Sequence, residues 1–157
     1  MVEPPELDLG TVALFTGYAA AAELMREVAA EGYGDVRFSH GYVFQHLVDA
    51  SPTIGDLAAR LDMTQQGASK IVAELERAGY VARVADVGDA RVRRVELTPR
   101  GVEMLRVYRA ARFRQEQRLV ALYGAERLAA ARALLVEVLE GMGGAEAVRR
   151  RDVRPPV

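Results

Sequence analysis

Residues 53–98 read TIGDLAARLDMTQQGASKIVAELERAGYVARVADVGDARVRRVELT. Thr53, with Asp56 three residues later, forms a variant of the capping box, a pattern that starts a helix. Thr64 is a good N-cap for a second helix, because its hydroxyl can accept a hydrogen bond from an otherwise unpaired backbone N–H. Gly79 can adopt the positive φ that ends this helix. Apolar residues recur at helical spacing in both segments, at Ile54, Leu57, Ala58 and Leu61 and at Ala68, Ile71, Val72 and Leu75. The stretch therefore predicts two short helices joined by a tight turn.

The second helix carries a polar face near its N-terminal end, made of Thr64, Gln65, Gln66, Ser69 and Lys70. Glutamine can make paired hydrogen bonds to the adenine edge, serine can donate or accept, and lysine can reach guanine or a phosphate. A helix-turn-helix places the N-terminal residues of its second helix in the major groove. An ordinary solvated helix face has the same polarity, so these residues alone leave both interpretations open.

Two strands are predicted after this helix, at Tyr80–Val84 and Arg91–Leu97. Residues 86–89 form the turn between them, and Gly88 is expected to take the unusual dihedral angles there. The tip of this ribbon carries three arginines, Arg91, Arg93 and Arg94. A hairpin that directly follows a helix-turn-helix is the winged-helix arrangement, in which such arginines hold phosphates or enter the minor groove. Alternatively, these charges could simply protect the edge of a strand from pairing with another chain.

The wing segment resembles a known family. The runs Asp89-Ala90-Arg91, Arg93-Arg94-Val95 and Leu97-Thr98, with Gly101 three residues on, resemble the wing signature of the MarR family of transcriptional regulators. The preceding run from Leu75 to Val81, with Arg83 after it, resembles the end of that family's recognition helix and its first wing strand. The chain differs from the common pattern at Ala90, where the family usually has a basic residue.

The resemblance implies a mainly α fold with a small β-hairpin wing. We expect a single domain over residues 1–157, with the winged helix-turn-helix at 36–98 and dimerisation helices at 8–31 and 99–141. These terminal helices carry apolar stripes that need a partner, and a two-fold dimer would present two recognition helices roughly 34 Å apart, about one turn of DNA. The expected partners are therefore a second copy of the chain and a pseudo-palindromic DNA duplex.

The flanking segments have their own signals. Residues 1–9 contain two prolines and are expected to form an extended arm, followed by a helix over 10–30 that Gly32 and Gly34 end. Ser39 is expected to cap a helix over 40–49. Thr98 and Pro99 are expected to open a helix to Tyr123, because proline loses nothing at the first helical position. A last helix is expected over 125–139, and residues 149–156 should form a mobile tail.

Composition limits the classes of function. The 157 residues include no cysteine, which excludes disulfides, thiol redox sensing and cysteine metal ligands. We find no membrane-spanning run and no secretory signal, so the expected location is the cytoplasm. The net charge of −1 is segregated: residues 1–59 carry −7, residues 60–100 carry +2 and residues 101–157 carry +4. This local distribution, rather than the total, steers a polyanion.

The resemblance also implies a pocket for a small aromatic or phenolic effector between the dimerisation helices and the winged helix. The aromatic and histidine side chains that could line it are Tyr18, Tyr33, Phe38, His40, Tyr42, Phe44 and Phe113. They could equally be ordinary core residues. His40 and His46 are six residues apart and do not share a helix face as zinc ligands would, so we expect no metal and no other cofactor.

The first hypothesis is a homodimeric DNA-binding regulator, a repressor whose DNA affinity a small ligand changes. In this hypothesis Asp89 orients Arg91 through a charge-assisted hydrogen bond, and both belong to the DNA-binding wing. The alternative is a winged-helix protein-interaction module that does not read DNA, since fold alone does not fix function. We expect no enzyme, because no catalytic grouping of residues is visible.

Overall fold

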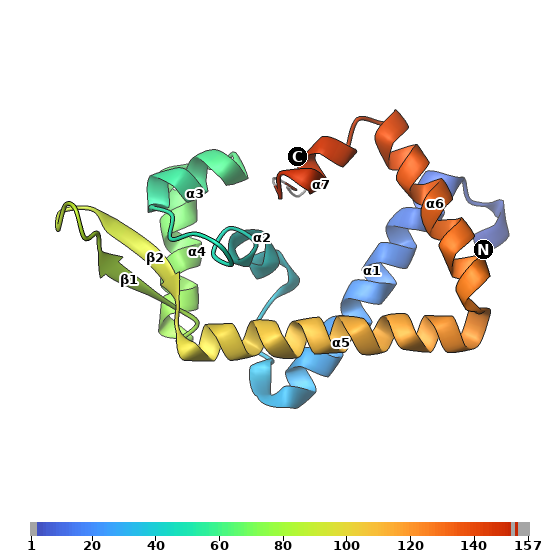
Figure 1. The fold of residues 1–157 in the computed structure, drawn as a ribbon, viewed down its shortest axis with the longest axis horizontal. Coiled ribbons are helices and arrows are strands. Elements are labelled where there is room, and N and C mark those ends of the chain that lie inside the picture. The colour runs from blue at the N-terminus through green and yellow to red at the C-terminus, as the bar shows by residue number, and fades with distance from the viewer. Residues whose placement is uncertain (1–2, 152, 154–157) are drawn as a thin grey trace.

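The computed structural model describes residues 3–151 and 153, and its longest element is α5 (Pro99–Tyr123). As Figure 1 shows, α5 runs along the long axis of the molecule, with the winged helix at one end and α6 (Ala125–Gly141) at the other. Helix α1 (Leu9–Val28) crosses α5, and α7 (Ala145–Arg149) turns back toward the winged helix. The fold is mainly α with one two-stranded sheet, as predicted.

The winged helix consists of α2 (Gly41–Phe44), α3 (Ile54–Leu61), α4 (Gln65–Arg77), β1 (Val81–Ala85) and β2 (Arg93–Leu97). The strands are antiparallel, with Val81 opposite Leu97 and Ala85 opposite Arg93. Val95 donates its N–H to the Pro52 carbonyl at 2.8 Å, so β2 is also tied to the segment that precedes α3. Leu57, Val72 and Leu75 are fully buried in the core between these elements.

The predicted helix starts are confirmed. The Thr53 hydroxyl accepts from Asp56 N at 3.1 Å, and Asp56 accepts from Thr53 N at 2.9 Å. The Thr64 and Thr98 hydroxyls each accept a backbone N–H three residues on, at 3.1 Å. Each such cap is worth about 1 kcal/mol. Gly79 has φ +78° after α4, as predicted for the residue that ends this helix.

The N-terminal predictions need correction. Residues Pro4–Glu6 form a 3₁₀ helix rather than an extended arm, because Glu6 accepts the Glu3 N–H and closes the turn. Met1 and Val2 of the predicted arm lie outside the described residues. The backbone after α1 continues as a single π-helical turn, Ala29–Tyr33, in which Gly32 has φ +92°.

The helix predicted over 40–49 is much shorter. A 3₁₀ helix spans Phe38–His40, and α2 follows only as far as Phe44. Ser39 is not its cap. Instead, the His40 ring accepts the Arg37 backbone N–H at 3.2 Å at the start of the 3₁₀ turn, which begins two residues before the predicted helix.

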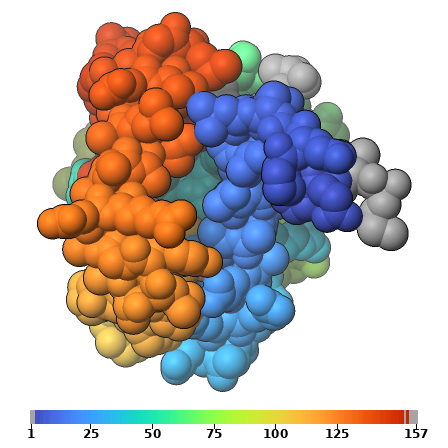
Figure 2. Space-filling model, turned by 90° about the vertical axis from the view of Figure 1, so that its right-hand side faces the viewer, coloured from blue at the N-terminus to red at the C-terminus, as the bar shows by residue number. Residues whose placement is uncertain are grey.

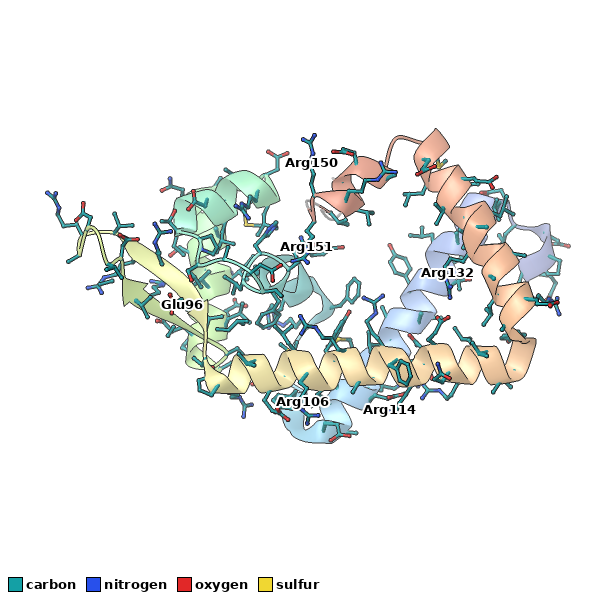
Figure 3. All side chains as sticks on the ribbon, viewed as in Figure 1. Glu96, Arg106, Arg114, Arg132, Arg150 and Arg151 are labelled. Atoms are coloured by element: carbon teal, nitrogen blue, oxygen red, sulfur yellow. The ribbon has the colours of Figure 1, made fainter. Side chains whose placement is uncertain are left out.

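Of the predicted tail, the structure describes residues 149–151 and 153, and its mobility stays a prediction. Helix α7 is followed by Arg150 and Arg151, and Arg151 forms an ion pair with Asp49 beside the winged helix (Figure 3). Arg149 pairs with Glu140 at 2.7 Å and Arg150 with Glu146 at 2.6 Å. The sequence pattern could not reveal the Asp49 contact, because its partners are 102 residues apart. The remainder of the predicted tail is described only at residue 153.

The terminal helices expose large apolar side chains. On α1 and on α6 with the end of α5 these are Leu9, Leu14, Phe15, Tyr18, Leu122, Leu134, Leu135 and Leu139. Figure 2 shows this side of the molecule, with α1 on one side and α6 on the other. A shallow groove of about 200 Å³ lies between them, lined by residues that include Val12 and Leu135. Among the described residues, no helix is both long enough and apolar enough to cross a membrane.

Candidate nucleic-acid interface

The polar tip of α4 is presented to solvent. Gln65, Gln66 and Lys70 are exposed, and Thr64 is exposed while its hydroxyl caps the helix. Ser69 is only half-buried, and its carbonyl accepts a hydrogen bond from Arg83 Nη2 at 3.2 Å. The face therefore offers amide, hydroxyl and ammonium groups, the side-chain types that read base edges in the major groove.

Gln65 also lies close to the first helix of the motif. A Cβ placed on Gly55 would be 3.6 Å from Gln65 Nε2, an ordinary contact distance. The amide of Gln65 therefore packs over the start of α3.

The wing is anchored by Asp86. Its carboxylate accepts hydrogen bonds from the backbone of Gly88 at 2.8 Å and of Asp89 at 3.2 Å, and it pairs with Arg94. These hydrogen bonds hold the pKa of Asp86 below its ordinary value, and the bond from the Arg94 guanidinium has the largest effect. Arg94 Nη1 also donates to the Ser51 carbonyl at 3.0 Å. Arg94 thus fastens the wing to the segment before α3, and its predicted contact with DNA stays a prediction.

The turn of the wing is longer than predicted. The strands end at Ala85 and begin again at Arg93, so Arg91 lies in the loop and not in a strand. Gly88 does not have the positive φ that was predicted, because the carboxylate of Asp86 shapes the turn through the backbone N–H groups. Val87 at the tip is fully exposed, a feature that strand patterning does not reveal.

Arg91 is an exposed charge of the wing, with 92% of its side chain accessible. Asp89 Oδ1 accepts from both the backbone N–H of Arg91 at 3.0 Å and its Nε at 3.2 Å. These bonds lower the pKa of Asp89, the backbone bond most. Asp89 therefore orients Arg91 as the sequence predicted. Arg93 is exposed on β2. Of the three wing arginines, Arg91 and Arg93 are therefore exposed, whereas Arg94 is bonded to Asp86 and Ser51.

Comparison with known proteins agrees with this geometry. Residues 35–92 match the model of the MarR family. This segment is a MarR-family winged helix. No curated protein sequence matches the chain.

Several solved structures share the fold over most of their length. MepR of Staphylococcus aureus, a transcription regulator of the multidrug efflux pump MepA, is 21% identical, with 87% of this chain and 99% of MepR covered and a TM-score of 0.66. YusO of Bacillus subtilis is 20% identical, with 84% and 91% covered and a TM-score of 0.67. The transcriptional regulator Tm0710 of Thermotoga maritima is 17% identical, with 88% and 96% covered and a TM-score of 0.63. At these identities the likeness establishes the fold.

An apolar cavity of about 70 Å³ lies between α1, α5 and the α2 end of the winged helix. Of the side chains predicted to line a pocket, Phe38 and Phe44 do so. Its other lining residues include Met25, Met104 and Tyr108, which the predicted set did not contain. The only signal for them was their position on the apolar stripes of the long helices.

The other predicted pocket residues lie elsewhere. Tyr18 and Phe113 are exposed on α1 and α5. Tyr33 packs near Tyr80, and Tyr42 packs edge-to-face on Phe38 beside a separate hollow. These four therefore do not line the cavity with Phe38 and Phe44.

The histidines are both buried. His40 borders a polar hollow between the segment after α1 and the end of α4, whose lining also includes Asp35, Arg37, Glu74 and Arg77. Burial, and then the nearby charge of Arg37, lower the pKa of His40. His46, which follows α2, is only 4% exposed. Within residues 3–151 and 153, no group of histidine and carboxylate side chains is arranged to hold a metal ion.

Proposed function

We propose that the protein is a homodimeric, sequence-specific DNA-binding transcriptional regulator. The observation that carries this proposal is the pairing of an exposed amide- and lysine-bearing helix tip with an arginine wing, on a segment that matches the MarR family. A MepR variant of the same fold has been solved bound to an oligodeoxyribonucleotide, at 21% identity and a TM-score of 0.61.

In this proposal the tip of α4 enters the major groove and the wing contacts the adjacent backbone or minor groove. Gln65, Gln66 and Lys70 reach base edges, with Thr64 and Ser69 beside them. Arg91 and Arg93 contact phosphates or the minor groove, and Arg94 acts chiefly by holding the wing in place.

The terminal helices support the dimer. An exposed row of leucines and aromatic side chains on α1 and α6 is unusual for a monomer, and burying it against a second copy removes apolar surface from water. The two-fold axis would then set two recognition helices roughly one DNA turn apart.

We also propose that the regulator is a repressor, and that binding of a small aromatic effector lowers its affinity for DNA. The cavity at Phe38 and Phe44 lies between the dimer helices and the winged helix. A ligand bound there would therefore favour one distance between the two recognition helices over another. At about 70 Å³ it is smaller than the roughly 150 Å³ of an engineered cavity that holds benzene, so the effector must widen it. A MepR structure with bound ethidium bromide, also 21% identical, offers a precedent in the fold.

The decisive experiment is selection of bound sequences from a random duplex pool, with titrations of the winning duplex at several salt concentrations. We expect a two-fold symmetric consensus and a steep fall of affinity with salt, because phosphate contacts release counterions. The variant Gln66→Ala should lose preference at one base position in each half-site. A protein-interaction module, the alternative that Ala90 and the small local charge favour, would yield no consensus and little salt dependence.

A further inference from the structure

Tyr80 is the residue that joins the recognition helix to the wing, and its side chain is fully buried. Its hydroxyl is nevertheless paired with charged groups. It donates to the carboxylate of Asp35, and it accepts from Arg100 Nη2 at 3.2 Å. Arg100 Nη2 is also 3.8 Å from Asp35 Oδ2, which closes a three-membered network. Only Tyr80 is buried in this network, since the side chains of Arg100 and Asp35 are 47% and 49% exposed. The buried hydroxyl depends on these two partners for its hydrogen bonds, which favours one arrangement of the three residues.

The same guanidinium stacks on two rings. Arg100 Cζ lies 4.9 Å from the centre of the Tyr80 ring and 5.4 Å from that of Tyr33. A cation at this distance from an aromatic face is attracted to it, and the attraction grows where water is excluded. Burial, then the bond to Asp35, raise the pKa of Tyr80 to about 12, so its hydroxyl remains a donor at neutral pH.

The backbone on both sides of Tyr80 is pinned as well. Thr98 N donates to the Tyr80 carbonyl at 3.0 Å, and the Thr98 hydroxyl donates to the Gly79 carbonyl at 2.5 Å. The end of α4 is therefore fixed to the first turn of α5 by backbone bonds and to the segment after α1 by the side chain of Asp35.

We propose that the Tyr80 hydroxyl is a positioning group that sets the angle of the recognition helix against α1 and α5. Because those helices form the dimer in the proposed function, the network of Tyr80, Asp35 and Arg100 would fix the spacing of the two recognition helices. This inference rests on the proposed function and deepens it. It assigns no DNA contact to Tyr80, which acts only through α4.

The test uses the absence of cysteine in the chain. A single Arg77→Cys substitution, at the exposed end of α4 away from its reading tip, gives one spin label per protomer. The distance between labels in the dimer and the affinity for the selected duplex are measured for the labelled parent and for Tyr80→Phe. We expect a shifted or broadened distance and an affinity about 10-fold weaker, within the range usual for coupling between sites.

Two further variants serve as a second test and as a control. Asp35→Asn keeps an acceptor but removes the charge, so it should change the distance in the same direction and remains informative if Tyr80→Phe folds poorly. Tyr42→Phe removes a hydroxyl from another tyrosine packed on the same core, and it should leave distance and affinity at parental values.

The outcomes are separable. If Tyr80→Phe and Asp35→Asn lower only the melting temperature, while distance and affinity stay parental, the positioning role is wrong. If the parent binds no duplex but the variants still shift the label distance, the positioning role stands and the DNA-binding function fails. A parent that gives no distance between labels is monomeric, which overturns both.

Discussion

Gly101 lies where the first turn of α5 passes the backbone of Tyr80. A Cβ on Gly101 would come 2.1 Å from the Tyr80 carbonyl oxygen, a distance that no relaxation of a flexible side chain can relieve. The position requires glycine because of this close approach, since its φ is not in the left-handed region.

We therefore predict that Gly101→Ala destabilises the fold by about 2 kcal/mol or more, as overpacking of a well-packed site does. Urea denaturation would measure the change in free energy of unfolding. Gly141→Ala is the matched control, since a Cβ there meets nothing within 4 Å. Equal stability of both variants would contradict the close approach.

Tyr80 gives a prediction about alkaline pH. Its pKa in the folded protein is raised to about 12, so the neutral phenol is favoured in the fold relative to the unfolded chain. This contribution is complete below about pH 10, the ordinary tyrosine pKa, and is lost as pH rises from there toward 12. The free energy of unfolding should therefore fall over this range, and more shallowly in Tyr80→Phe. Tyr123→Phe, at an exposed site, should keep the parental slope.

Residues whose partners are close in sequence could be predicted from it. The caps at Thr53, Thr64 and Thr98 depend on groups three residues away, so local rules identify them. The role of Tyr80 could not be predicted, because its partner Asp35 is 45 residues distant. The anchoring role of Arg94 could not be predicted either, because the Ser51 carbonyl that it contacts lies 43 residues away. The sequence therefore suggested only a DNA contact for this arginine.

At the scale of elements, the wing holds one exposed arginine and one arginine that anchors it to the rest of the winged helix. Arg91 is exposed and oriented by Asp89, whereas Arg94 ties the loop to the segment before α3. Both residues carry one positive charge in the same short hairpin. Substituting each in turn therefore removes the same charge, and any difference between the two variants comes from where the arginine lies.

We predict that Arg91→Ala weakens binding to all duplexes and reduces the slope of log affinity against log salt by about 1 if it contacts one phosphate. Arg94→Ala should lower the melting temperature as well, since it leaves Asp86 without its guanidinium partner. Fluorescence anisotropy and thermal melts of both variants provide the comparison. An unchanged salt slope in Arg91→Ala would remove this residue from the interface.

Elements with clear start and stop signals were predicted well, and those without them were not. Helices α3, α4 and α5 begin at the predicted caps, and Gly124, with φ +84°, separates α5 from α6 as expected. The segment around α2 was predicted too long because its apolar residues continue past Phe44 at near-helical spacing, although the helix itself ends there. Burial, rather than helical periodicity, explains those residues.

At the scale of the whole molecule, the terminal helices carry both internal ion pairs and uncovered apolar faces. Acidic Glu23 and Glu27 on α1 pair with Arg118 on α5, so several arginines of the C-terminal half are paired within the chain. Exposed ion pairs of this kind add little stability. The apolar faces of α1 and α6 remain as the large uncovered surface of these helices.

We predict that Leu135→Asp converts a dimer into a monomer, because it puts a charge into the apolar groove between α1 and α6. Sedimentation velocity would measure the change, and affinity for the two-fold duplex should fall with it. Ala59→Asp adds the same charge on α3, outside the terminal helices, and should remain dimeric. A dimeric Leu135→Asp would place the interface elsewhere.

The packing of Gln65 over Gly55 has a consequence for how such a protein acquires a new target sequence. An alanine at Gly55 would fit, since its Cβ would touch Gln65 Nε2 at an ordinary 3.6 Å, but a longer side chain would have to displace the amide. A substitution at Gly55 could therefore change the preferred DNA sequence even though Gly55 itself does not contact DNA in the proposed function. A search for specificity mutations that is limited to DNA-contacting residues would miss it.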